Sequence, residues 1–278
     1  MSDHLCNLVI PGAAKSGTSS LHELLNLHPQ ICMSERKEPH YFCRPDVHAR
    51  GADFHNSLFD KTGQERIFGE SSTGYLLWPE AIAQIRHDLA DPKIIILLRE
   101  PVARAFSHYR WRYRLGLETR SFLRAMQEDG YGYDPMHPDG GYGYTAYLQF
   151  SNYAEYCPLW ETAFGAGNVL MLDSASLKTD HIGVQTRCFD FLGVDNTPAR
   201  EGVAANRTEE VVSRRPIIRK GRRVVPDALK RSTAYKALRA VVRKRLTPTP
   251  PAAMSDEEAA YASRKLAADV AWFRDRFG

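Results

Sequence analysis

The sequence lacks the features that mark several large classes of protein. No apolar run approaches the roughly 18 residues that cross a membrane. The opening MSDHLCNLVIPG has neither the basic start nor the long apolar stretch of a signal peptide. The five cysteines are scattered, odd in number and never spaced as CxxC, so they indicate neither a disulfide framework nor a zinc site. We therefore expect a cytoplasmic protein with reduced, partly buried thiols.

The composition is that of an ordinary globular protein, but its charge is unevenly placed. Apolar residues make up 43% and charged residues 25% of the 278 positions, which suits one α/β domain with a sizeable core. Residues 214–245 hold 13 Lys/Arg and one acid, a local charge of +12 against +4 overall. This asymmetry predicts an anionic partner or surface near the basic segment.

Apolar runs alternate with helix-compatible stretches over the first 193 residues. Continuous apolar runs, of which KIIILL is the clearest, predict buried strands at residues 5–11, 66–70, 93–98 and 168–172. Helical spacing predicts helices at residues 18–27, 79–89, 101–115, 147–164 and 181–192, with a Gly/Tyr/Pro-rich loop at 129–144. This alternation predicts an α/β fold with a P-loop-like parallel sheet flanked by helices.

The pattern weakens toward the end of the chain. Residues 206–226 are polar and basic, which predicts irregular structure, and residues 227–246 form a basic helix candidate. Ser255, with Glu258 three residues later, predicts a capping box that opens a last helix running toward Phe277. We expect a first domain at residues 1–226 and a helical C-terminal extension at 227–278 packed on it.

The turn between the first strand and the first helix is suited to an anion. A helix N-terminus offers free N–H groups and the positive end of a dipole, and Lys15 adds a mobile charge. A Walker A loop requires GxxxxGK[ST], whereas the lysine here precedes the second glycine in GAAKSGT. This order, with no convincing acidic strand end to hold magnesium, weakens a kinase interpretation.

The order K-[SG]-G-T after a first strand resembles the 5′-phosphosulfate loop of sulfotransferases that use PAPS (3′-phosphoadenosine 5′-phosphosulfate). The pattern is like that of the heparan-sulfate sulfotransferases and their bacterial relatives, and it extends to the L-x-x-HP ending at Pro29. The resemblance implies that Lys15 also neutralises the oxygen of the leaving nucleotide. It assigns the donor's 5′ end to Lys15, Ser16, Gly17, Thr18 and Ser19.

The segment KIIILLREPVARAFSHY at residues 93–109 supplies a second anchor. Arg99 follows the clearest strand and Ser107 comes eight residues later, at the sheet edge where ligands of parallel α/β folds bind. The segment resembles the family's 3′-phosphate motif L-R-[DE]-P-x-x-R-x-x-S-x-Y. This implies that Arg99 and Ser107 hold the 3′-phosphate, for which the planar fork of arginine is suited, and that Arg104 is structural.

The segment ERKEPHYF at residues 35–42 resembles the family's E-x-H-[FY]-F, whose glutamate is the proposed general base. The resemblance implies that Glu38 takes the acceptor's proton during in-line displacement at sulfur. Glu35 is the alternative, but it lacks the aromatic pair behind it. A surface carboxylate paired with Lys37 or Arg36 also stays open. Because a sulfuryl group carries less charge than a phosphoryl group, no metal is expected.

Two segments match the family less closely. ESSTGY at residues 70–75 resembles E-K-[ST]-P-x-Y, but the family lysine falls on Ser71. Glu70, His40 and Trp111 are assigned to the acceptor, although Glu70 could equally be a satisfied strand-end carboxylate and His40 a packed histidine. IRKGRR at 218–223 resembles a loop that closes over the 3′-phosphate, which implies that Lys220, Gly221 and Arg222 bind the donor.

Together these patterns predict a metal-independent sulfotransferase. It would move a sulfuryl group from PAPS to a hydroxyl or amine of a carbohydrate or small metabolite and release PAP (adenosine 3′,5′-bisphosphate). The alternatives are a nucleotide-dependent kinase and a non-enzymatic protein that binds anions or a membrane surface through residues 227–245. No nucleic-acid module is recognisable, so nucleic acid is not expected as a partner. The sequence leaves the acceptor and the oligomeric state open.

Overall fold

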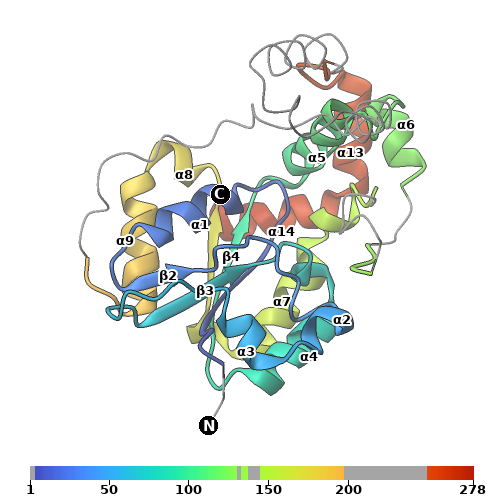
Figure 1. The fold of residues 1–278 in the computed structure, drawn as a ribbon. Helices are drawn as coiled ribbons and strands as arrows, with labels where there is room; N and C mark the ends of the chain where they lie inside the picture. Colours follow the sequence, from blue (N-terminus) through green and yellow to red (C-terminus); the bar gives the residue numbers. More distant parts are fainter. Residues whose placement is uncertain (1–3, 130–132, 137–144, 197–248) are drawn as a thin grey trace, which may run out of the picture.

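A parallel sheet of five strands forms the centre of the computed structural model, which describes residues 4–129, 133–136, 145–196 and 249–278 (Figure 1). The strand order is β2-β3-β1-β4-β5, and every neighbouring pair is parallel. The strands are β1 (Leu8–Gly12), β2 (Ile31–Met33), β3 (Ile67–Ser71), β4 (Lys93–Leu98) and β5 (Val169–Asp173). The predicted fold class, a P-loop-like parallel sheet flanked by helices, is confirmed.

Most of the described helices flank the two faces of this sheet (Figure 1). In chain order they are α1 (Thr18–Asn26), α2 (Pro45–His48), α3 (Gly51–Asn56), α4 (Pro79–Asp88), α5 (Pro101–Leu115), α6 (Phe122–Gln127), α7 (Tyr153–Phe164), α8 (Ser176–Thr179), α9 (His181–Leu192), α13 (Asp256–Lys265) and α14 (Ala267–Phe277). Three short 3₁₀ turns, η1 (Tyr75–Leu77), η2 (Gln149–Ser151) and η3 (Ala166–Asn168), connect them. Helices α5, α6 and α13 instead gather to one side of the sheet (Figure 1).

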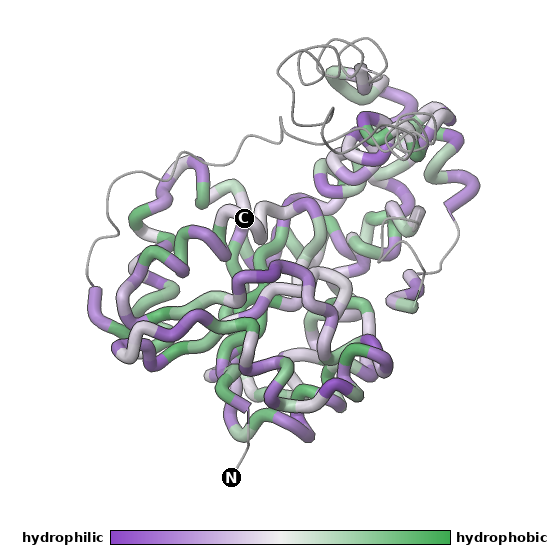
Figure 2. Tube along the Cα trace, in the orientation of Figure 1, coloured by the Kyte–Doolittle hydropathy of each residue, from purple (hydrophilic) through white to green (hydrophobic). Residues whose placement is uncertain are grey.

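Both faces of the sheet are apolar, because successive strand residues point to opposite sides. On one face, Leu8 and Ile10 of β1 pack with side chains of α1 and α9. On the other face, Val9 belongs to a second cluster that includes Trp160 of α7 and side chains of α4 and α14. Figure 2 shows hydrophobic residues recurring along the strands and hydrophilic ones along the outer helices and loops. The result is a three-layer arrangement with the sheet in the middle.

The long elements lie where the sequence predicts them, with ends that shift by a few residues, but several short ones were not predicted. These are β2, α2, α3, α6 and α8, which span three to six residues each. The helix predicted from residue 147 begins at Tyr153, because the carboxylate of Asp129 accepts the N–H groups of Tyr147 (3.0 Å) and Leu148 (2.6 Å). The predicted last helix is divided at the buried Leu266 into α13 and α14.

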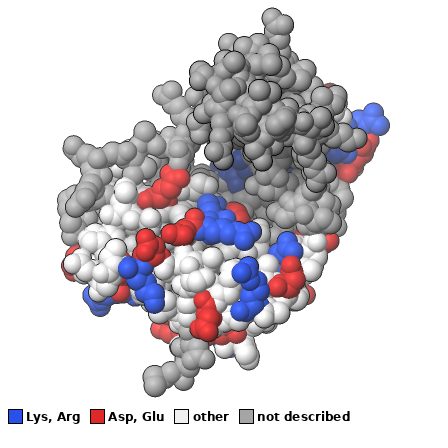
Figure 3. Space-filling view, viewed as in Figure 1, with Lys and Arg blue, Asp and Glu red and all other residues white. Residues whose placement is uncertain are grey.

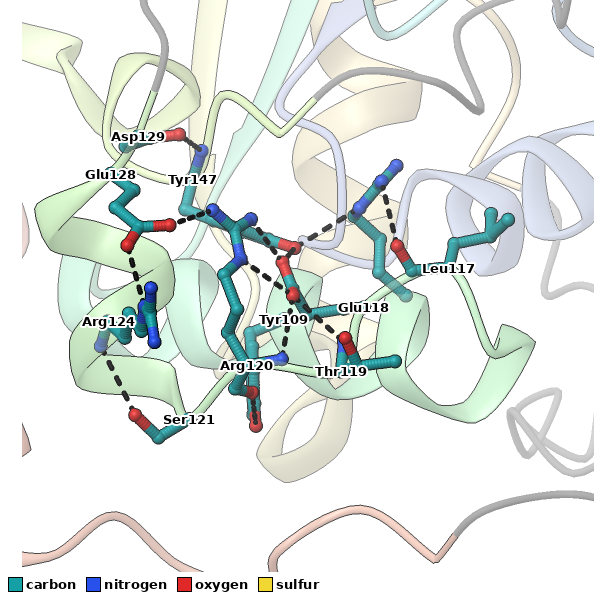
Figure 4. Close-up of polar contacts among 11 residues, drawn as sticks. Tyr109, Leu117, Glu118, Thr119, Arg120, Ser121, Arg124, Glu128, Asp129 and Tyr147 are labelled. Atoms are coloured by element: carbon teal, nitrogen blue, oxygen red, sulfur yellow. Dashed lines mark hydrogen bonds and ion pairs between the residues drawn. The ribbon is translucent and has the colours of Figure 1, made fainter.

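A buried polar network joins the end of α5 to the segment at residue 147 (Figure 4). The carboxylate of Glu118, only 4% exposed, accepts from the Tyr147 hydroxyl at 2.8 Å and from Arg120 Nη2 at 2.6 Å. Arg112 Nε donates to the same Tyr147 hydroxyl at 3.1 Å. These paired charges fix the orientation of α5 relative to α6 and the residues before α7.

Arg104 of α5 is a structural residue, in agreement with the sequence interpretation. Its side chain is fully buried and donates to Ser151 Oγ at 2.6 Å, to the Ala14 carbonyl at 3.4 Å and to the Tyr147 carbonyl. A buried guanidinium is stable only when its donors find acceptors, and here each of its three nitrogens donates to one. Arg104 thereby ties α5 to the turn that follows β1.

The C-terminal helices pack against elements from the middle of the chain. Helix α13 contacts α6 and α5, and α14 contacts α7 and α5. Asp269 of α14 accepts the backbone N–H of Ala154 at 3.0 Å and so caps the first turn of α7. Trp272, Phe273 and Phe277 of α14 pack on the cluster that covers one face of the sheet.

Several other expectations can be compared with the described residues. All five cysteines are free and are buried, more completely than the partial burial that the sequence predicts. Within the described part of the chain, no helix combines the length and apolar character needed to span a bilayer. Figure 3 shows positive and negative side chains interspersed on the described part of one face. The predicted irregular segment 206–226 and the basic helix 227–246 lie outside the described residues.

The predicted capping box is present at the start of α13 and gives a test of stability. Glu258 N donates to Ser255 Oγ at 3.2 Å, and Ser255 N donates to the Glu258 carboxylate at 3.0 Å. We expect Ser255→Ala to lower the free energy of unfolding by about 1 kcal/mol, measured by chemical denaturation. The control is Ser263→Ala at an exposed position of the same helix, which should be neutral or slightly stabilising. Equal effects of the two substitutions would contradict the prediction.

Candidate active site

The predicted anion-binding turn and Arg99 follow neighbouring strands of the sheet. β1 pairs in parallel with β4, and the Ala13 N–H donates to the Leu97 carbonyl at 2.7 Å. Lys15 lies in the turn that follows β1, three residues after Gly12, and Arg99 comes directly after β4. Because the carboxyl ends of parallel strands share one edge, both side chains start from the edge where ligands of such folds bind.

The turn after β1 directs several donors to this edge. Gly17 has φ 99°, in the left-handed region that favours glycine, and it directly precedes α1. The first N–H groups of α1 have no acceptor within the helix, and its first turn contains no acidic residue. The hydroxyls of Ser16 and of Tyr153 at the start of α7 are buried, and neither has a hydrogen-bond partner among the described residues. An oxyanion bound here would satisfy such donors.

Lys15 lies within a group of positive charges. Burial, together with the nearby positive charges of Arg114, Lys37, Arg99 and Arg104, lowers the pKa of Lys15 to about 8. Lys15 Nζ lies 4.9 Å from the ring centroid of Trp111, a cation–π contact. No carboxylate among the described residues forms an ion pair with Lys15, so its charge is available to an anionic ligand.

One face of α5 carries further polar groups of the site. Ser107, Arg110, Trp111 and Arg114 are all half-buried and follow the three- and four-residue spacing of a single helix face. Burial lowers the pKa of Arg99, and Arg110 adds to this effect. The Nε of Arg110 is buried and has no hydrogen-bond partner within the described chain. Arg110 and Arg114 were not predicted, although their spacing from Ser107 could have indicated them.

Glu38 is held at the carboxyl end of β3. Its backbone N–H donates to the Ser71 carbonyl at 2.9 Å, and its φ of 59° is left-handed. Its carboxylate accepts from Thr73 N at 2.8 Å, from Thr73 Oγ1 at 3.0 Å and from Lys37 Nζ at 2.8 Å. Burial alone would raise the pKa of Glu38, but Lys37, His40 and these hydrogen bonds outweigh it and lower the pKa. Glu38 is therefore ionised at neutral pH, and Thr73 is a contact that the sequence did not indicate.

The other residues assigned to the acceptor occupy different positions. His40 lies beside Glu38, with Nε2 4.0 Å from Oε2, and burial lowers its pKa. Glu70 is 0% exposed and accepts from the Tyr75 hydroxyl at 2.9 Å and from Ser72 Oγ at 3.1 Å. Burial raises the pKa of Glu70 to about 8. The side chain of Glu70 is therefore enclosed. Of the two roles that the sequence left open, these contacts favour a satisfied strand-end carboxylate over a contact with the acceptor.

The candidate site thus combines four segments around one edge of the sheet. These are the turn after β1, the end of β4 with Arg99, helix α5 with Ser107 and Trp111, and the loop after β2 with Glu38. The predicted donor contacts Lys220, Gly221 and Arg222 lie outside the described residues. Within the part of the chain that the structure describes, no group of three or more His, Cys, Asp or Glu side chains is arranged to hold a metal ion.

The chain belongs to the sulfotransferase family. The family described as "Sulfotransferase domain" matches residues 6–214, three quarters of the chain. This match covers the turn after β1, the Glu38 segment and the β4–α5 segment.

Known relatives support the same family. The chain is 30% identical over 188 residues to heparan sulfate glucosamine 3-O-sulfotransferase 6 of Homo sapiens, covering 67% of this chain and 52% of that protein. It is 29% identical over 195 residues to heparan sulfate glucosamine 3-O-sulfotransferase 3A1 of Mus musculus, covering 69% of this chain and 47% of that protein. The chain therefore spans about half the length of these curated relatives.

A solved structure extends the likeness to the fold. The crystal structure of a sulfotransferase from Alicyclobacillus acidocaldarius superposes with a TM-score of 0.61 at 28% identity. The match covers 87% of this chain and 95% of the other.

The pKa of Lys15 gives a test of the anion site. As the pH rises through about 8, Lys15 loses its proton and its attraction for an anion. We expect the affinity for sulfate, whose charge is constant in this range, to fall about tenfold between about pH 7 and about pH 9, measured by thermal shift. Lys15→Met should bind sulfate weakly and lose this pH dependence. The exposed Lys61→Met is the matched control and should keep it; an unchanged dependence in Lys15→Met would contradict the assignment.

Proposed function

We propose that this protein transfers a sulfuryl group from PAPS to a hydroxyl or amine acceptor and releases PAP. The observation that carries the proposal is the adjacency of two cationic strand ends, with Lys15 after β1 and Arg99 after β4. PAPS carries a 5′-phosphosulfate and a 3′-phosphate on one nucleoside, so it requires two anion sites on one cleft. The membership in the sulfotransferase family supports the same donor.

The two ends of the donor are assigned to different elements. The 5′-phosphosulfate is assigned to Lys15, Ser16, Gly17, Thr18 and Ser19, where the start of α1 and the buried Ser16 hydroxyl supply donors. The 3′-phosphate is assigned to Arg99 and Ser107, with Arg110 near enough to Arg99 to contribute. Lys220, Gly221 and Arg222 remain predicted contacts of the same phosphate.

Glu38 is assigned the role of general base. The acceptor's O–H or N–H gives its proton to the Glu38 carboxylate while the acceptor atom forms a bond to sulfur. The bond between sulfur and the bridging oxygen of the 5′-phosphate breaks, and its electron pair leaves with PAP. Lys15, beside the 5′ end, neutralises the charge that grows on that oxygen. The lowered pKa keeps Glu38 ionised and able to accept the proton at neutral pH.

The acceptor is proposed to be a carbohydrate or a small metabolite. The two relatives described above are heparan sulfate glucosamine 3-O-sulfotransferases, and this chain belongs to the same family. The Trp111 ring lies against Lys15 Nζ, and His40 lies beside Glu38, so each of the two rings adjoins one of the assigned catalytic groups. An aromatic face beside the reacting groups is suited to stack on a sugar ring or an aromatic acceptor.

Glu38→Gln tests the base. We expect turnover of labelled PAPS to fall by about 10² or more, because the amide cannot take the acceptor's proton, while PAP still stabilises the protein in a thermal-shift assay. The wild type should keep its sulfuryl-transfer activity in EDTA, whereas a magnesium-dependent kinase would lose its activity. The matched control is Glu35→Gln, an exposed carboxylate three residues earlier, which should keep its activity. Full activity in Glu38→Gln would remove Glu38 from this role.

Arg99→Met tests the assignment of the 3′-phosphate. We expect the affinity for PAP to fall by about tenfold to a hundredfold, because a charge-assisted, two-pronged contact is lost. The affinity for adenosine 5′-phosphate, which lacks the 3′-phosphate, should change much less, as measured by isothermal titration. The exposed Arg86→Met of α4 serves as the control and should bind both nucleotides like the wild type. An equal loss for both nucleotides in Arg99→Met would place the arginine elsewhere on the donor.

A further inference from the structure

Lys37 is a cation that the assigned reaction does not yet use. It directly precedes the assigned base, and its side chain is only 24% exposed. Its Nζ donates to Glu38 Oε1 at 2.8 Å. Its positive charge is also close enough to lower the pKa values of Lys15 and of His22 in α1. Lys37 therefore contacts the assigned base and also acts electrostatically on Lys15, in the turn that is assigned the 5′ end of the donor.

The contact with Lys37 restrains the base. Glu38 Oε1 accepts from both Lys37 Nζ and Thr73 Oγ1, and Oε2 accepts from Thr73 N. Every hydrogen bond to a carboxylate stabilises its ionised form and weakens it as a proton acceptor. The two contacts from Thr73 orient the carboxylate, whereas the one from Lys37 engages the oxygen with a full positive charge. Removing the ammonium from Oε1 would strengthen the base without disturbing its orientation.

Ser71, which stands where the resembling family has a lysine, cannot supply a positive charge to the sulfuryl group. Ser71 is 0% exposed, and its hydroxyl pairs with His22 Nδ1 at 2.9 Å. Burial lowers the pKa of His22 to about 4, so this histidine is neutral at physiological pH. Among the described cations, Lys37 is the one that contacts the base and also acts on Lys15. A lysine has a flexible stem and three donors, so it can change partners over a few ångströms.

We propose that Lys37 is a donor-sensing cation of the active site. Without nucleotide it holds the Glu38 carboxylate, and with PAPS bound it turns to the sulfuryl oxygens. This movement neutralises the group being transferred and frees Oε1 to accept the proton of the acceptor. The inference rests on the proposed function and deepens it, because it links binding of the donor to the strength of the base.

The proposal implies a change in the pH dependence of the reaction. The titratable groups that face Glu38 are Lys37 and His40 of its own segment, Cys43 after it, Glu70 of β3 and His22 of α1. Of these groups, Lys37 lowers the pKa of Glu38 the most. Loss of Lys37 therefore raises the pKa of Glu38 in the free enzyme. The value of kcat/KM for PAPS, which reports the enzyme without nucleotide, falls at low pH as Glu38 takes up a proton. This fall, the acid limb of the pH profile, should then move to higher pH.

The test compares Lys37→Met with Arg36→Met, an exposed cation one residue earlier. The affinities for PAPS and for PAP are measured for each variant, because PAP lacks the sulfuryl group. We expect Lys37→Met to weaken PAPS binding about tenfold more than PAP binding. We also expect kcat to fall tenfold or more and the acid limb of the kcat/KM profile to move to higher pH. Lys37→Arg should restore part of kcat, and Arg36→Met should behave like the wild type.

The outcomes separate this inference from the proposed function. If the wild type transfers the sulfuryl group but Lys37→Met keeps the PAPS-to-PAP affinity ratio and the acid limb, the role of Lys37 is overturned and the proposed function stands. If the wild type neither binds PAP nor uses PAPS, the proposed function fails and the inference falls with it. PAP-induced thermal stabilisation reports folding, and Lys37→Gln provides the same readouts if Lys37→Met is unstable.

Discussion

The parallel pairing of β1 with β4 is the constraint on which the candidate site depends. The bond from the Ala13 N–H to the Leu97 carbonyl sets the register in which the two strands end. That register fixes the separation between the turn bearing Lys15 and the start of α5 after Arg99. Arg104 reinforces it from the helix side, since it donates to the Ala14 carbonyl from within α5. The backbone thus sets the relative positions of the two segments that are proposed to bind the donor's phosphates.

Concentrating positive charge at one edge has an energetic cost for the free protein. Burial and its cationic neighbours lower the pKa of Lys15 from 10.5 to about 8, so the folded state holds this proton less tightly than the unfolded chain. The destabilisation is fully present below about pH 8 and is relieved as the pH rises toward 10.5. A bound anion would reverse the effect and stabilise the protonated form. The electrostatic repulsion that destabilises the free protein therefore favours binding of an anion at this edge.

Much of the fold could be predicted from the sequence because the long elements have clear periodicity. Continuous apolar runs located four of the strands, and the capping box located the start of α13. The three-residue β2 carries too little pattern to be recognised, and the shift of the α7 start depends on Asp129, which is distant in sequence. The last helix was predicted as one because nothing in its periodicity marks the break at the buried Leu266.

The candidate site could be proposed from the sequence only where local motifs carry its residues. Lys15, Arg99 and Glu38 stand in short motifs next to strand ends, so their types and spacing could be read directly. Thr73 contacts Glu38 from 35 residues away, and no local pattern connects the two. The enclosure of Glu70 by Tyr75 and Ser72 is likewise a property of packing rather than of spacing.

The packing of α14 on α7 bears on how the protein can be dissected. The segment that matches the family ends at residue 214, yet Asp269 caps α7, and aromatic side chains of α14 cover the sheet face next to it. Tyr153, the first residue of α7, carries one of the buried hydroxyls at the anion site. A fragment trimmed to the family segment would lose the cap of this helix and expose its apolar side. We therefore expect a fragment that folds on its own to require the final helix, although the recognisable motifs all lie upstream.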